Sequence, residues 1–89
     1  MTKTIELFIG SNNKTGKVER ELLESTLAKY HEGFTIQPSV GYWQGTREQS
    51  VVVTLSDEFS TILDTIQRLK QVLNQDAIAY HEVTALEFI

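Results

Sequence analysis

The spacing of apolar residues switches repeatedly between two periods along this chain, and this switching limits its fold more than any other feature. Residues 3–9, a stretch from Phe34, residues 48–55 and residues 76–83 have the period of two expected of strands. Two intervening stretches have apolar residues three or four positions apart, as in helices that bury one side. The order is therefore strand, helix, strand, strand, helix, strand.

The first helix is expected to start near Lys17 and to end before Gly33. Thr15 or Asn13 is expected to cap its start, and Gly33 its end, because glycine readily adopts the left-handed conformation found after helices. One stripe along this helix carries its apolar residues, namely Val18, Leu22, Leu23, Leu27 and Tyr30, together with Thr26.

The two central strands are expected to form an antiparallel hairpin. Residues 44–47 would connect them, because Gly45 permits a positive φ. Pro38 has no amide donor, so it should lie at a sheet edge or a bulge. One face of the first strand of the pair should carry Phe34, Ile36, Val40 and Tyr42.

The second helix is expected directly after residues 48–55. Ser56 would cap it, with Asp57 and Glu58 in its first turn, where negative charge is favourable. Its stripe is the most regular in the chain and comprises Phe59, Ile62, Leu63, Ile66, Leu69, Val72 and Leu73. Residues 84–89 are expected to add a short fifth strand.

This order of elements predicts one α+β domain over residues 1–89 with a ferredoxin-like βαββαβ fold. Right-handed crossovers place both helices on one face of a four-stranded antiparallel sheet. The residues expected to face the helices are Ile5, Leu7, Ile9, Ile36, Val51, Val53, Ile78 and Tyr80. A chain of this length buries only about 60–65% of its unfolded surface, so we expect a partner subunit to add stability.

The other face of the sheet supports this expectation of a homo-oligomer. It should present an apolar group made of Phe8, Trp43, Val52, Ala79 and His81, which is unusual on a monomer. Alternatively, the alternation slips at Pro38 and Trp43 points inward. The apolar residues Leu86, Phe88 and Ile89 near the end of the chain also suit edge-strand pairing between subunits.

Composition excludes several classes of function. With no cysteine, the chain has no disulfide, iron–sulfur cluster, thiolate zinc site or cysteine nucleophile. A net charge of -4 disfavours nucleic acid and anionic membranes as partners. No apolar run is long enough to span a membrane and the start lacks a secretory profile, so we expect a cytoplasmic protein.

The loop over residues 10–18 follows a strand and precedes a helix, as phosphate-binding loops do. It is not a Walker loop, because five residues separate its glycines and Val18 follows Lys17. Backbone amides at the helix start, together with Lys14 and Lys17, are expected to bind an anionic group. The alternative is a solvated turn with two surface lysines.

Tyr42, Trp43 and Arg47 surround the hairpin connection and together offer stacking surface and a fork of donors. This set suits a planar anionic ligand such as a nucleotide. The alternative is that the aromatic residues pack in a core or interface and that Arg47 pairs with a surface acid.

The two histidines occur in matching tripeptides, YHE at 30–32 and YHE at 80–82, which are expected near the same end of the sheet. A His/Glu metal site there is disfavoured because the HExxH spacing is absent. His31 suits the end of a helix, and His81 suits a pH-sensitive polar contact to a ligand or an interface. The spacing shows no catalytic serine–histidine–aspartate set, so we expect neither an enzyme nor a cofactor.

The element order, the mid-chain hairpin GYWQGTRE and the apolar C-terminal residues together resemble the small ferredoxin-like oligomers of the PII-like and CutA-like group. The resemblance implies trimers that bind nucleotides or other small anions between subunits, with or without chemistry. The chain departs from PII by lacking a long loop between its second and third strands, which puts loop-mediated regulation of a partner in doubt.

These observations lead to one functional hypothesis and two alternatives. The hypothesis is a non-enzymatic homo-oligomer that binds a nucleotide or other phosphate-bearing molecule as a sensor, or as a sponge of the viral anti-defence type. Its expected ligand contacts are Lys14, Lys17, Tyr42, Trp43, Arg47 and His81. The alternatives are a protein-interaction module that uses the open sheet face or an edge strand, and a small enzyme with His31 or His81 as base.

Overall fold

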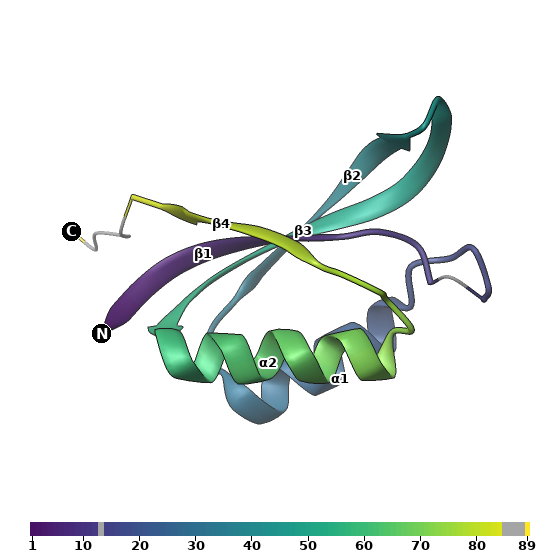
Figure 1. The fold of residues 1–89 in the computed structure, drawn as a ribbon. Coiled ribbons are helices and arrows are strands. Elements are labelled where there is room, and N and C mark those ends of the chain that lie inside the picture. Colours follow the sequence, from purple (N-terminus) through teal and green to yellow (C-terminus); the bar gives the residue numbers. More distant parts are fainter. Residues whose placement is uncertain (13, 85–88) are drawn as a thin grey trace.

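The computed structural model describes residues 1–12, 14–84 and 89, and it confirms the ferredoxin-like order (Figure 1). The elements are β1 (Thr2–Ile9), α1 (Arg20–Tyr30), β2 (Thr35–Trp43), β3 (Thr46–Glu58), α2 (Phe59–Val72) and β4 (Ala79–Val83).

The four strands form one antiparallel sheet in the order β2-β3-β1-β4. Both helices cover the same face of this sheet and leave the other face open (Figure 1). The longer helix, α2, has 14 residues, and no helix in the described part of the chain is long and apolar enough to cross a bilayer.

The core lies between the helices and the inner residues of the two central strands. Ile5, Leu7 and Ile9 of β1 are fully buried, and so are the alternate residues 51, 53 and 55 of β3. The helices contribute Leu23, Leu27, Ile62, Ile66, Leu69 and Leu73. Burying one such side chain stabilises a fold by about 1.5–3 kcal/mol relative to leaving it exposed, so these inward residues are the main source of stability in the sheet–helix contact.

Three residues expected in the core lie at its margin. Leu22 and Leu63 are each 38% exposed, because they sit at the edge of their helical stripes. Tyr80 pairs with Leu7 in the register and so shares the inner face, but it is 44% exposed on the edge strand. Its ring lies 6.4 Å from the ring of Phe59, which covers it only in part.

The start of α1 differs from the prediction. The helix begins at Arg20 rather than near Lys17, and the residue before it, Glu19, makes no side-chain capping bond. Thr15 does not cap the helix, and Asn13 lies outside the described residues. The preceding loop closes on itself instead, with Asn12 at its centre.

The end of α1 also differs, because His31 follows Tyr30 in an extended conformation with φ of -135°. The left-handed φ values of the described residues do not include Gly33, so this glycine does not end the helix in the expected way.

The junction of β3 and α2 corrects a second capping prediction. Residues 56–58 belong to β3 and not to the first turn of α2, because they pair with β1 as far as Glu58 opposite Thr2. Glu58, rather than Ser56, holds the N-cap position of α2, and it makes no side-chain capping bond. The Ser56 hydroxyl lies 2.6 Å from the Thr4 hydroxyl across the pair. Cross-strand pairing therefore overrides a local sequence that suits a helix start.

The hairpin between β2 and β3 is tighter and longer than expected. Only Gln44 and Gly45 form the turn, with φ of 51° and 80°, as a two-residue type I′ turn requires. β1 ends at Ile9 opposite Val51, so residues 39–50 form a two-stranded ribbon beyond the sheet (Figure 1). Pro38 lies in β2, an edge strand, as predicted.

At the C-terminal end, β4 begins at Ala79 rather than at residue 76, and Ile78 just before it is buried. The expected fifth strand falls mostly on residues 85–88, with Leu86 and Phe88 among them, which lie outside the described residues.

Two leucines of α2 test this account of the core. We expect Leu69→Ala to lower the free energy of unfolding by about 2–5 kcal/mol, because Leu69 is fully buried. The matched change Leu63→Ala should cost about 1 kcal/mol or less, since that side chain is 38% exposed. Denaturant unfolding measures both, and equal losses would contradict the placement of the core.

Candidate functional site

A broad hollow lies where α1, β2 and β3 meet. It is a groove of about 890 Å³, a size that suits a small-molecule ligand. Its lining comprises Tyr30, residues 32–35, Gln37 and residues 54–57. Thr35, the first residue of β2, pairs with Thr54, so β3 continues beyond its partner as an edge. Residues 55–57 of this edge form one wall of the groove.

One wall of this groove is held by a chain of three polar side chains. Asp57 Oδ2 lies 2.9 Å from His31 Nδ1, and His31 Nε2 lies 2.8 Å from Thr65 Oγ1. The Thr65 hydroxyl donates to the Thr61 carbonyl in the preceding turn of α2. The three side chains link the end of α1, the end of β3 and the middle of α2.

Of these three side chains, that of Asp57 lines the groove, and those of His31 and Thr65 do not. The backbone N–H of Glu58 and the His31 ring both donate to its carboxylate, and these bonds lower the pKa of Asp57 below its ordinary value of 3.8. The carboxylate is therefore ionised near neutral pH and fixed in orientation.

His31 is enclosed, with a side chain only 1% exposed, and Thr65 is buried with it. The distances that join Asp57, His31 and Thr65 are those of a catalytic triad. The Thr65 hydroxyl, which would be the nucleophile, lies in the core, away from any substrate. This enclosure argues for a positioning role and against His31 as a base.

The second histidine lies on the other side of the sheet. His81 Nε2 is 2.7 Å from Glu6 Oε1, and its ring is 5.4 Å from the ring of Phe8 on the open face. The sheet therefore separates the two histidines, since His31 is enclosed on the helix side and His81 lies on the open face, and they do not share a site. Within the described residues, no three histidine or carboxylate side chains are grouped as a metal site requires.

Lys14 and Lys17 lie in the loop between β1 and α1, and both are exposed. Lys14 borders a shallow hollow of about 380 Å³ together with Lys70 and residues 74–76 after α2. The amides near these lysines are already used: Asn12 Oδ1 accepts from the amides of residues 14 and 15. The loop therefore offers lysine charge to an anion rather than a cradle of free amides.

Tyr42 and Arg47 face each other across the tip of the ribbon. Tyr42 is 70% exposed, and Arg47 borders a second shallow hollow of about 380 Å³ with Ser39, Val40 and its two following residues. The ion pairs of the described residues do not include Arg47, Lys14 or Lys17. The side chain of Trp43 lies outside what the structure describes, so its expected direction stays a prediction.

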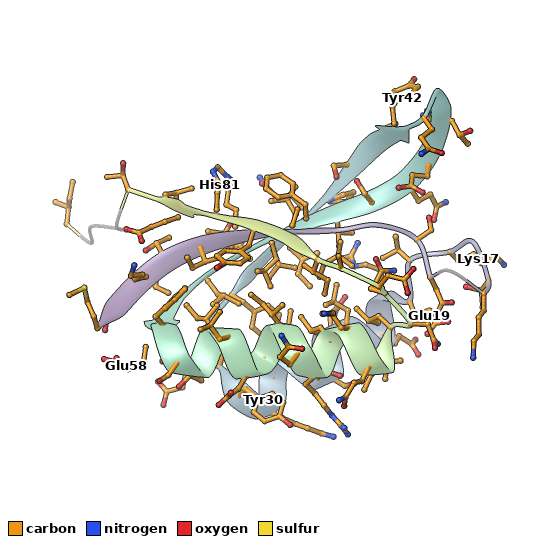
Figure 2. The ribbon with its side chains drawn as sticks, viewed as in Figure 1. Lys17, Glu19, Tyr30, Tyr42, Glu58 and His81 are labelled. Carbon is orange, nitrogen blue, oxygen red and sulfur yellow. The ribbon has the colours of Figure 1, made fainter. Side chains whose placement is uncertain are left out.

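Within one protomer, the expected ligand contacts lie in three separate places. Lys17 is in the loop, Tyr42 is at the ribbon tip and His81 is on the open face (Figure 2). The groove, in contrast, lies at the opposite end of the sheet from the ribbon and was missed by sequence reasoning. Its polar chain joins residues 26 and 34 positions apart, and no local spacing signals such a contact.

The Asp57–His31 contact predicts a pH dependence of stability. A carboxylate with a lowered pKa stabilises the fold above its ordinary value of 3.8, and this contribution is lost as the pH falls through the lower folded-state value. Asp57→Asn should therefore lower the free energy of unfolding near neutral pH, and its difference from the native protein should shrink in acid below about pH 3.8. Asp64→Asn, an exposed change on α2, is the control, and a pH-independent effect of Asp57→Asn would contradict the assignment.

Several solved structures share this fold. A DUF3240-family protein from Shewanella baltica gives a TM-score of 0.71 at 12% identity, over 100% of this chain and 98% of that chain. The divalent cation tolerance protein CutA1 of Thermus thermophilus gives 0.63 at 14% identity, over 100% and 88%. A PII-like signalling protein of the same organism gives 0.57 at 17% identity, over 93% and 85%.

No protein-family model matches the sequence, and no curated protein matches it either. At these low identities, the similarity to the solved structures concerns the fold. The chain has the ferredoxin-like fold of CutA-like and PII-like proteins, as the resemblance in sequence order predicted.

Proposed function

We propose that this chain forms a cytoplasmic homo-oligomer that binds a nucleotide or another phosphate-bearing small molecule without transforming it, as a sensor or a sequestering protein. The observation that carries this proposal is the tip of the β2–β3 ribbon. There, an exposed tyrosine ring lies opposite an arginine whose charge is not used in an ion pair among the described residues. A ring that stacks and a guanidinium that binds phosphate are the two elements that a nucleotide site needs.

The ribbon also supports assembly. Val40 and Tyr42 continue the inner face of β2 beyond the helix layer, so they are 52% and 70% exposed although they follow the core stripe of Ile36. A two-stranded ribbon alone is marginally stable in water. A second copy that covers it would stabilise it and would bring new side chains to its tip.

Assembly is also how the separate contacts would meet. Lys17 lies away from Tyr42 at the ribbon tip of the same protomer (Figure 2). A site between copies could combine the lysines of one with Tyr42 and Arg47 of another, and it could also include Trp43 or His81. Among the proteins of this fold, one is described as a PII-like signalling protein, which supports a binding role.

The enzyme alternative has one supporting structure. A phage SAM lyase, solved in complex with S-methyl-5′-thioadenosine, shares the fold with a TM-score of 0.54 at 14% identity, over 94% of this chain and 90% of that one. That protein shows that the fold can carry chemistry on an adenosine derivative. Here the histidine with the triad-like distances is enclosed, so we favour binding without turnover.

The interaction-module alternative rests on the open face. Phe8 is 44% exposed there, beside Val52 and Ala79 in the register. This alternative requires that a larger protein cover the face and that no nucleotide stabilise the free protein, so the ligand experiment below separates the two.

The ligand proposal is tested by thermal unfolding against a panel of mono-, di- and cyclic nucleotides, because a ligand of the native state raises the melting temperature. We expect one nucleotide to raise the melting temperature. Its affinity should be about tenfold or more weaker for Arg47→Ala and for Tyr42→Ala, because each variant removes one of the two proposed contacts. Lys17→Ala should weaken it less. Arg68→Ala is the control, since Arg68 is exposed on α2 and contacts only Gln71 at 3.4 Å.

Failure of every nucleotide to shift the melting temperature would remove the nucleotide proposal and favour the interaction module. Equal losses in Arg47→Ala and Arg68→Ala would point to general charge attraction rather than to a site at the ribbon tip.

The assembly is tested separately by light scattering coupled to size-exclusion chromatography. We expect a mass that is a multiple of the 10.1 kDa chain, with three copies as the resemblance implies. Val40→Lys should shift the protein toward the monomer, because it places a charge on the uncovered ribbon. Leu22→Lys makes a similar exchange on α1 and should not, and a 10.1 kDa native particle at micromolar concentration would overturn the proposal.

A further inference from the structure

The groove at the far end of the sheet has the opposite chemistry to the ribbon tip. It carries two carboxylates, Glu32 and Asp57, and the described residues that line it include no lysine, arginine or histidine. A phosphate would meet repulsion there without a compensating cation, so this groove is not a second part of the nucleotide site.

Other lining groups add to this negative potential. Tyr30 is 46% exposed at the end of α1, and Phe34 is half-buried at the start of the connection into β2. The faces of aromatic rings attract cations, most strongly those that water solvates poorly. The hydroxyl groups of Thr35, Thr54 and Ser56 complete the lining as neutral hydrogen-bonding groups.

The carboxylate of Asp57 is also fixed in place. His31 and the Glu58 backbone amide hold one oxygen each, and Thr65 holds the far side of the His31 ring inside the core. A charge fixed in this way loses little conformational entropy when a ligand binds. His31 is therefore a positioning residue for the groove, which it does not itself line.

From this juxtaposition of fixed carboxylate, second carboxylate and aromatic rings, we propose that the groove is a binding site for an organic ammonium cation. The volume of about 890 Å³ accommodates a ligand much larger than a metal ion. This site is separate from the proposed nucleotide site, and neither proposal depends on the other.

The test compares choline with its uncharged carbon analogue 3,3-dimethyl-1-butanol, which has nearly the same shape. Backbone amide signals of Gly33, Thr35 and Ser56 in NMR spectra report on the groove directly. We expect saturable shifts with choline and affinity at least about fivefold weaker for the analogue. A titration with n-butylammonium distinguishes a hydrogen-bonded primary ammonium from a quaternary one held by the rings.

Three variants make the test specific. Glu32→Gln and Asp57→Asn should each weaken choline binding by about threefold or more, and Glu32 is an exposed residue whose change leaves the Asp57–His31 contact intact. Asp64→Asn removes the same charge from the exposed side of α2 and should leave binding unchanged. Should Asp57→Asn fail to fold, Glu32→Gln still decides the matter.

Three results would overturn the proposal. The first is the absence of saturable shifts with both ammonium probes. The second is equal affinity for choline and its neutral analogue, which would make the groove merely apolar. The third is a loss in Asp64→Asn as large as in Glu32→Gln, which would reflect the net charge of the protein rather than a site.

Discussion

The whole structure depends on burial against a single face of the sheet. The inner residues of β1 and β3 are enclosed by two helices, and together they form the hydrophobic core of the described residues. The helices do not cover the whole sheet. The parts that remain at the surface are the open sheet face, the ribbon beyond Ile9 and the groove beside α1. This uncovered surface contains apolar side chains on both faces of the sheet, with Phe8 on the open face and Val40 and Tyr42 on the other.

Much of the fold could be predicted from sequence, because the two periods depend on which side chains face the core. Alternation in β1 and β3 and the stripes of the two helices identified most of the buried apolar residues. Errors arose where distant pairing outweighed local preference. Ser56, Asp57 and Glu58 suit a helix start, but β1 holds them as a strand. Likewise, the alternation of Ile36, Val40 and Tyr42 predicts that these side chains share one face of the sheet. It does not show where along β2 the helices stop covering that face.

The site was less predictable than the fold for a related reason. The sequence identified exposed residues of the hairpin and of the loop as individual candidates. It did not show that these residues lie in separate places within one protomer. The groove depends on His31, Asp57 and Thr65, which come from three elements and approach only when the chain has folded. The two ends of the molecule differ in charge: the groove is lined by two carboxylates and by no cation among the described residues, whereas each shallow hollow combines at least one cationic side chain with one carboxylate.

The central position of β1 has a consequence for the order of folding. Its partners are β3, in a register that joins Thr2 to Glu58, and β4, which begins only at Ala79. β2 and β3, in contrast, are neighbours in sequence and close through a two-residue turn. As the chain leaves the ribosome, the β2–β3 hairpin can form from local contacts, whereas β1 can pair with β3 only after the residues of β3 have appeared. In this topology the first strand therefore stays unpaired longest. The time needed to bring β1 to β3 across the intervening residues sets how long the nascent chain can form incorrect strand pairs.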